Sequence, residues 1–379
     1  MREQVAEHQR DALVERLFES AIGMMEIVTV YLGDRLGLYR ALADHGPATP
    51  ADLAARTGTH ERYAREWLEQ QASAGILNVD AADADAEARR YILPEAHAEA
   101  LLDRDSLSYT TPITWQLVGV VRPLDALLEA FKTGGGVPYA QYGADMREGI
   151  AYANRAMFVN LMGTEWLPAI PDVHERLRDD PPARVADVGC GTGWSSIAIA
   201  RAYPKARVDG FDLDEESLAE ARANAEAEGL ADRVRFQVRD AADPDLSGRY
   251  DLAIAVECIH DMSRPVQALR AMRGLVGESG VALVVDERVG EGFAAPGDEI
   301  ERLMYGFSVL HCLPVGMAEQ PSAGTGTVMR PSTLRRYALE AGFSDAEILP
   351  IEHDLWRFYR LVTGDPRPDV SERGPSGTA

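Results

Sequence analysis

The segment Val185–Gly193, VADVGCGTG, carries residue types that could bind a small ligand through the backbone. A short apolar run leads into one acid and three glycines at alternate positions: Asp187, Gly189, Gly191 and Gly193. Because glycine has no Cβ, a ligand can lie against such a backbone and the chain can turn sharply there. The dinucleotide fingerprint G-x-G-x-x-G would need a glycine at Trp194, and the lysine of a P-loop is absent. The pattern predicts a ligand-binding turn between a strand and a helix, without a phosphate cradle.

The stretch Asp187–Gly193, DVGCGTG, resembles the first motif of class I S-adenosylmethionine (SAM) methyltransferases. SAM has an amino acid end, a sulfonium and an adenosine but no pyrophosphate, so a bare turn flanked by acids suits it. The resemblance implies that Asp187 and the three glycines bind SAM and that the product is S-adenosylhomocysteine (SAH). The alternative is an ordinary glycine turn in an α/β sheet.

Two acids downstream extend the resemblance. Asp212 ends the next strand-like run, GFDLD, where a carboxylate accepts hydrogen bonds from ribose hydroxyls. Leu213 would then lie against the adenine, whereas Asp214 is predicted to cap the following helix. The family places an acid near the adenine amino group at the position of Asp240, next to Ala241. A solvated loop acid is the alternative interpretation of Asp240.

The segment ECIHDM follows the fourth strand-like run, and its histidine could take a proton from a methyl acceptor. The carboxyl ends of the strands form the site in such folds, so we expect Glu257 beside SAM and His260 beside the transferable methyl group. IHDMSRP resembles the LHDW segment of plant-type small-molecule O-methyltransferases, whose histidine is a general base. Asp261 would orient the ring or cap the next helix. Met262 and Arg264 depart from the family's tryptophan and acid, and catalysis by proximity and desolvation alone is the alternative.

Side chains in two further segments are candidates for a substrate pocket: Phe158, Met162, Trp166, Tyr305, His311 and Met317. Ordinary core or lid packing is the alternative for each of them, and His311 is the second candidate for the base. As metal ligands, His260, His311 and Asp286 do not form a convincing set, and the three cysteines show no CxxC spacing. We therefore expect a metal-independent reaction.

The element pattern divides the chain into three parts and a tail. Residues 1–110 are predicted to form helices and a short β-ribbon, the pattern of a winged helix, and residues 111–180 a helical linker that contributes to the pocket. In residues 181–363 strand-like runs alternate with helices, which predicts the α/β class: a Rossmann-like parallel sheet ending in an antiparallel edge hairpin. Residues 364–379 are rich in proline, glycine and charge and are predicted to be disordered.

The winged-helix domain has two interpretations. An apolar stripe from Leu13 to Leu32 is predicted to lie on one long helix that continues to His45, and it suits a dimerisation module, as in the small-molecule O-methyltransferases. The alternative is a transcriptional regulator whose methyltransferase domain senses SAM. A net charge of −23 and an acidic wing at Asp80–Glu87 oppose contact with DNA phosphates. We therefore expect a homodimer with no nucleic-acid partner.

The apolar runs are too short for a membrane span and the first residues lack a signal core, so we expect a cytoplasmic protein without a membrane partner. Taken together, the motifs predict SAM-dependent methyl transfer to a small molecule. A hydroxyl of an aromatic or polyketide-like natural product is the expected acceptor, with nitrogen and carbon as alternatives.

Overall fold

The computed structural model describes residues 2–80, 85–243 and 250–364. The chain divides into two compact units, the first made of residues 1–122 and 143–156 and the second of residues 123–142 and the chain from residue 157 onward. The segment predicted as a linker, 111–180, is therefore shared between the two units. The predicted disordered tail, apart from Gly364, and residues 81–84 of the predicted wing lie outside the described residues.

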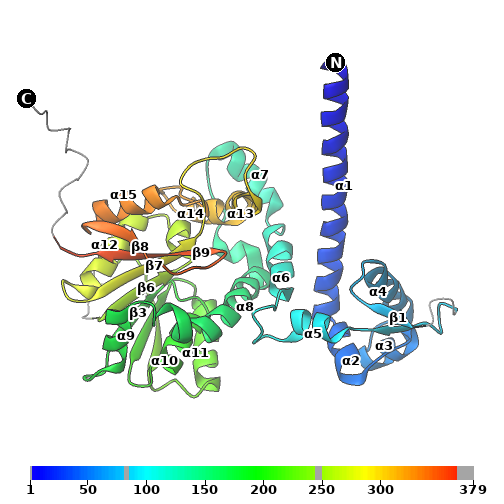
Figure 1. Ribbon diagram of the computed structural model, residues 1–379, viewed down its shortest axis with the longest axis horizontal. Helices are drawn as coiled ribbons and strands as arrows, with labels where there is room; N and C mark the ends of the chain where they lie inside the picture. Colours follow the sequence, from blue (N-terminus) through cyan, green and yellow to red (C-terminus); the bar gives the residue numbers. More distant parts are fainter. Residues whose placement is uncertain (1, 81–84, 244–249, 365–379) are drawn as a thin grey trace, which may run out of the picture. The chain divides into compact units, whose positions relative to one another are not determined.

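The first unit follows the predicted order of helices and a two-stranded ribbon (Figure 1). Its elements are α1 (Arg2–Arg35), α2 (Leu38–His45), α3 (Pro50–Thr57), α4 (Glu61–Ser73), β1 (Asn78–Asp80), β2 (Arg90–Ile92), α5 (Glu95–Leu102) and α6 (Thr111–Val120). Thr49 caps α3 through a capping box, and Gly58 ends this helix in the left-handed region. β1 and β2 pair antiparallel, which completes the winged-helix pattern.

The single long helix predicted to reach His45 is wrong, because α1 ends at Arg35 and α2 begins at Leu38. Gly37 between them has a φ of 69°, in the left-handed region that interrupts a right-handed helix. The C-terminal part of α1 packs on the rest of its unit: a Cβ at Gly33 would lie 2.4 Å from the ring of Trp67. The N-terminal part of α1 projects beyond α2, α3 and α4 (Figure 1), and its large apolar side chains are exposed.

The second unit contains a seven-stranded sheet in the order β5-β4-β3-β6-β7-β9-β8. The strands are β3 (Arg184–Val188), β4 (Arg207–Asp212), β5 (Val234–Val238), β6 (Leu252–Val256), β7 (Val281–Glu287), β8 (Asp345–Ile348) and β9 (Trp356–Val362). β3 to β7 are parallel, whereas β9 pairs antiparallel with both β7 and β8. The predicted α/β sheet with an antiparallel edge hairpin is thus confirmed.

Helices cover both faces of this sheet (Figure 1). One face packs against α10 (Trp194–Ala202) and α11 (Glu215–Ala227), and the other against α12 (Pro265–Val276) and α15 (Pro331–Ala341). Neighbouring residues on β3 belong to opposite faces, as the two-residue repeat of a strand requires: Val185 joins the first core cluster and Ala186 the second. The parallel strands therefore end at one edge, between two packed layers.

The remaining helical segments flank these layers. They are α7 (Leu124–Thr133), the short turn Tyr139–Tyr142, α8 (Gly143–Leu161, shared by the two units), the π-helical turn Met162–Trp166, α9 (Pro171–Arg178), the short turn Ile259–Asp261, α13 (Glu299–Phe307), the π-helical turn Ser308–Cys312 and α14 (Leu313–Gly316). Within the described part of the chain, no helix combines the length and the apolar character needed to cross a bilayer.

Candidate active site

The predicted glycine turn joins β3 to α10, and each of its three glycines has a positive φ. Two of them are needed for packing, because a Cβ at Gly189 would lie 2.7 Å from Cys258 Sγ and one at Gly193 would lie 2.5 Å from the ring of Phe236. A Cβ at Gly191 would meet nothing within 4 Å. Space beside the backbone is therefore open at Gly191, where a ligand could approach.

Asp212 lies at the end of β4 and holds this turn in place. Its Oδ2 accepts a hydrogen bond from the Gly191 N–H at 2.8 Å, and its Oδ1 accepts one from the Asp214 N–H at 2.9 Å. A carboxylate has about four acceptor positions, so Asp212 can accept further hydrogen bonds from a ligand. Asp214 caps α11 as the sequence predicts, and Leu213 beside it is 57% exposed.

Asp187 is buried beneath the glycine turn and faces α10. Its Oδ2 accepts hydrogen bonds from the hydroxyls of Ser195 and Ser196, each at 2.6 Å. Burial raises the pKa of Asp187 to about 6, although the two serines oppose this shift. The carboxylate thus ties β3 to the first turn of α10, and its predicted contact with SAM stays a prediction. Sequence reasoning missed the two serines, which only the fold brings next to Asp187.

Asp240 follows β5 and lies in a loop that is partly open to solvent. Its Oδ1 accepts a hydrogen bond from the Ala242 N–H at 2.8 Å, and its carboxylate also pairs with Arg264. Ala241 packs against the second core cluster. Arg264 stands where the O-methyltransferase motif has an acid. It pairs with Asp240, the carboxylate expected near the adenine amino group.

Glu257 directly follows β6 and has a φ of 50°, which is uncommon for a residue with a side chain. Its Oε1 accepts a hydrogen bond from Trp356 Nε1 at 2.6 Å, and its N–H donates to the Val285 carbonyl of β7. Glu287 on β7 is a buried neighbour, and its pKa lies well above the ordinary value because of burial and the adjacent Glu257 carboxyl. No sequence motif pointed to Glu287.

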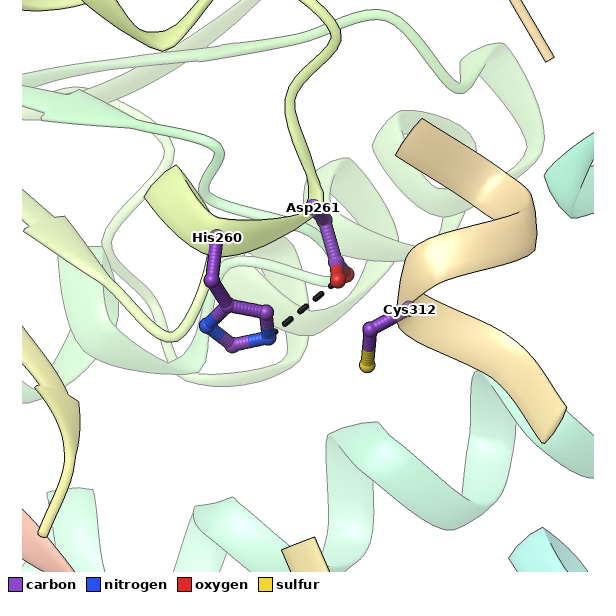
Figure 2. A group of neighbouring side chains, drawn as sticks. All are labelled: His260, Asp261 and Cys312. Atoms are coloured by element: carbon purple, nitrogen blue, oxygen red, sulfur yellow. Dashed lines mark ion pairs between the residues drawn. The ribbon is translucent and has the colours of Figure 1, made fainter. Parts of the chain in front are cut away.

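His260 is buried between two carboxylates. Its Nδ1 lies 2.8 Å from Asp286 Oδ1. Its Nε2 lies 3.2 Å from Asp261 Oδ1, the ion pair drawn in Figure 2. Burial by itself would lower the pKa of His260, but Asp286 and Asp261 outweigh it, so the pKa lies well above its ordinary value. Asp286 at the end of β7 is thus a partner of the predicted base, and the parallel strands β6 and β7 bring the two together.

His311, the second candidate for the base, is also buried near this group. Its ring packs edge-on against Tyr139 and Tyr142, and its Nδ1 lies 3.5 Å from Cys312 Sγ. Burial lowers the pKa of His311 to about 4, so its imidazole is neutral at neutral pH. His311 lacks a partner comparable to Asp286 on its other ring nitrogen, which receives no hydrogen bond within the described residues.

The other predicted substrate residues lie in two places. Phe158, Met162 and Trp166 are buried in the first core cluster, where Phe158 stacks on Trp356 with ring centroids 5.7 Å apart. Tyr305 on α13 is partly exposed, and its hydroxyl accepts a hydrogen bond from Arg330 at 3.2 Å. Met317 follows α14 and is half-buried. Contact of any of these side chains with a substrate stays a prediction.

The residues at the carboxyl ends of the strands fit a nucleoside with a cationic arm. The backbone is open at Gly191, Asp212 keeps acceptor capacity for ribose hydroxyls, and Leu213 presents an exposed apolar side chain for a base. The turn lies where the strand order reverses around β3, which is the usual ligand site of open α/β sheets. Asp187, Asp212 and Glu257 give this edge a negative charge.

Comparison with known proteins matches two parts of the chain to two different domains. A family model described as a methyltransferase domain matches residues 185–280, and one described as an Rv2258c-like winged HTH domain matches residues 21–104. The mitomycin 7-O-methyltransferase MmcR superposes with a TM-score of 0.70 at 20% identity, covering 94% of this chain and 99% of that one. Human N-acetylserotonin methyltransferase, solved in complex with SAM, has a TM-score of 0.67 at 18% identity, covering 93% and 98%.

Among curated proteins, ajmaline N-methyltransferase from Rauvolfia serpentina is 32% identical over 111 residues, which is 28% of this chain and 38% of that protein. The chain spans between 24% and 38% of the length of the first curated relatives that it matches. The fold and the motif thus define a class I methyltransferase sheet preceded by a winged helix. The chain carries a methyltransferase domain at residues 185–280 and a winged helix-turn-helix domain at residues 21–104.

Proposed function

We propose that this protein is an enzyme that transfers a methyl group from SAM to a small molecule. The observation that supports this most strongly is the turn at Gly191. There an open backbone, held by Asp212, lies at the switch point of a sheet whose strands β3 to β6 fall in the segment that matches a methyltransferase domain. When bound, SAM would supply an electrophilic methyl group on a cationic sulfur, with SAH as the product.

The cofactor would be held by the residues predicted for that role. Asp212 would accept hydrogen bonds from the ribose hydroxyls while its Oδ2 keeps the Gly191 N–H in place. Leu213 would cover the adenine, and Asp240 would accept from the adenine amino group once Arg264 gives up that carboxylate. Glu257 would contribute negative charge to the cationic end. Binding in this form would align the methyl group with an acceptor and would exclude water, and much of the rate would arise from this.

His260 would take the acceptor's proton at Nε2 only in its neutral form. Because Asp286 and Asp261 raise the pKa of His260 well above its ordinary value, the ring would first have to release its own Nε2 proton. Asp286 holds Nδ1 at 2.8 Å, which fixes the ring and stabilises the imidazolium that forms, as a buried carboxylate does in a catalytic triad. Asp261, at 3.2 Å from Nε2, would give up this position to the acceptor hydroxyl and then orient it. An acceptor that already presents a free lone pair, such as an amine, would need only the alignment.

The acceptor we favour is a hydroxyl of an aromatic or polyketide-like natural product. The similarity to a mitomycin 7-O-methyltransferase supports oxygen, and the similarity to ajmaline N-methyltransferase keeps nitrogen as the alternative. Incubation of the purified protein with SAM and a panel of phenols, hydroxyquinones and secondary amines tests both. We expect SAH to form only with some of the phenolic compounds. If no compound yields SAH and SAM does not bind, the proposed function is wrong.

The winged-helix unit would serve to join two copies of the chain. The N-terminal part of α1 exposes large apolar side chains that its own unit leaves uncovered: Val5, Leu13, Val14, Leu17, Phe18, Ile22, Met24 and Met25. An exposed apolar row of this kind indicates a protein interface. The alternative, a regulator that binds DNA and senses SAM, has the support of the winged helix-turn-helix match but is opposed by the net charge of −23.

A further inference from the structure

A nitrogen, an oxygen and a sulfur donor meet beside the predicted base. The side chains of His260, Asp261 and Cys312 place their donor atoms within 4.8 Å of one another (Figure 2). The first two lie on the short turn after β6, and Cys312 ends the π-helical turn that follows α13. The cysteine comes 51 positions after the aspartate in the sequence, so spacing alone does not reveal this group.

The surroundings of these three side chains are those of a ligand set. Metal-binding histidines usually donate their second ring N–H to a carboxylate, which fixes the ring and directs the other nitrogen at the metal. In this protein Asp286 is the carboxylate next to Nδ1 of His260, and Nε2 of the same ring faces Asp261. Asp261 Oδ1 is buried and receives no hydrogen bond of good geometry from the described residues. Cys312 is a buried free thiol.

We propose that His260 Nε2, an Asp261 carboxylate oxygen and Cys312 Sγ form a site for a divalent transition-metal ion of the zinc type. Zinc binds these three donor types in tetrahedral sites with bonds of about 2.0–2.3 Å, and three protein ligands leave its fourth position open. Such bonds hold the donor atoms roughly 3.3–3.8 Å apart. His260 Nε2 and Asp261 Oδ1 are already 3.2 Å apart, so the remaining contraction, of up to about an ångström, concerns the approach of Cys312 Sγ. The thiolate disfavours magnesium and calcium, which prefer oxygen ligands.

Binding is balanced by proton release. The Cys312 thiol loses its proton to solvent as the sulfur–metal bond forms, and His260 must have lost any proton on Nε2. The metal is then bound to His260 Nε2, the atom that would otherwise accept a proton from the methyl acceptor. Zinc is thus expected to inhibit turnover. This consequence rests on the proposed function, whereas the proposal that the metal binds does not rest on it.

Cobalt titration of the full chain tests the site directly. The protein is first treated with a chelator, the chelator is removed, and cobalt(II) is added as a spectroscopic substitute for zinc. We expect a thiolate-to-cobalt charge-transfer band that saturates at one equivalent per chain and disappears when zinc displaces the cobalt. Absence of the band from the wild-type protein overturns the proposal, whether or not SAM binds in a separate experiment.

Three variants identify the ligands. Cys312→Ser should abolish the charge-transfer band, and Asp261→Asn should weaken cobalt binding at least tenfold while the band survives at higher metal concentration. Cys190→Ala removes another buried thiol outside the group and should keep the wild-type titration. Thermal melts without metal establish that each variant is folded. A band that persists in Cys312→Ser, or that is lost in Cys190→Ala, overturns the assignment.

Discussion

His260 and Asp286 form a buried pair, with Nδ1 of the imidazole 2.8 Å from Oδ1 of the carboxylate. Asp286 lies near the end of β7, and His260 lies on the short turn Ile259–Asp261 that follows the neighbouring parallel strand β6. The pair holds Nδ1, whereas Nε2 faces Asp261 Oδ1 at 3.2 Å and would have to exchange that partner for the methyl acceptor. The first prediction depends on these different roles of the two ring nitrogens.

His260→Ala should lower kcat by about a hundredfold or more, because general-base catalysis contributes about that much. SAM affinity should stay within a few-fold of wild type, since the predicted cofactor contacts come from other residues. Asp286→Asn should lower kcat by less, because the base remains but loses its charged partner. Steady-state assays and calorimetry with SAH measure the two quantities.

His174→Ala is a matched control for this prediction, because His174 lies on α9 and bonds Tyr203, away from the carboxylates. Its turnover should equal that of wild type. Unchanged turnover in His260→Ala would mean that alignment of the acceptor is enough, and it would contradict the assignment of a base.

Gly191→Arg should abolish cofactor binding while the domain still folds. Its Cβ would meet nothing, but its φ of 50° makes a side chain cost about 1–2 kcal/mol, and the long side chain would occupy the open space. A saturating ligand at about a hundred times its Kd stabilises a protein by about 2.7 kcal/mol. We therefore expect SAH to raise the Tm of wild type and to leave that of the variant unchanged, as measured by differential scanning fluorimetry.

Gly274→Arg provides the comparison, because Gly274 is exposed on α12 and also has open space around its Cα. This variant should retain the full SAH-induced shift. A variant of Gly191 that still responds to SAH would show that the turn is not the cofactor site.

Asp187 should make the protein less stable as the pH rises. Burial raises its folded-state pKa from 3.8 to about 6, so the folded state binds this proton more tightly than the unfolded state does. The corresponding stability is fully present below about pH 4 and is lost as the pH rises through 6. The difference of about two pKa units corresponds to about 3 kcal/mol.

Asp187→Asn should remove this pH dependence. The free energy of unfolding of the variant, minus that of wild type, should increase between pH 4 and pH 7 and then level off, as urea melts at several pH values would measure. Glu226→Gln, an exposed change on α11, should follow the wild-type curve. A constant difference for Asp187→Asn would contradict the raised pKa.

Charges on α1 should separate the proposed dimer. Phe18 and Met25 are 67% and 66% exposed, and burying each in an interface would contribute roughly 1.5–3 kcal/mol. The double variant Phe18→Glu with Met25→Glu should therefore be a monomer in size-exclusion chromatography with light scattering. Tyr63→Glu places one charge on α4, where the side chain is 79% exposed, and should leave the dimer intact. A wild-type monomer at micromolar concentration would contradict the dimer itself.

DNA binding should be absent at physiological salt. Phosphate contacts by Lys and Arg supply essentially all non-specific affinity for DNA, and this chain carries 61 acidic against 38 basic residues. A gel-shift assay with genomic fragments, with and without SAM, measures this. A specific shift would favour the regulator with a SAM-sensing domain over the dimerisation module.

Elements whose signals are local could be predicted from the amino-acid sequence alone. The strands of the second unit, the glycine turn at Gly191 and the cap at Asp214 follow from hydrophobic periodicity, backbone freedom and capping chemistry, each within a few residues. The break between α1 and α2 at Gly37 also has a local cause. A single glycine between apolar positions can either end a helix or be tolerated within it, so the sequence does not show which of the two occurs.

Which side chains act together could be seen only in the folded chain. Asp286 contacts His260, and Cys312 lies near the same histidine although it comes from a distant turn. Two serines donate hydrogen bonds to Asp187, and Glu287 lies next to Glu257. Parallel strands end at the same edge however far apart they lie in the sequence, so the contacts between their carboxyl ends depend on strand order and register. Those two properties come from packing of the whole sheet, and no short stretch of sequence contains them.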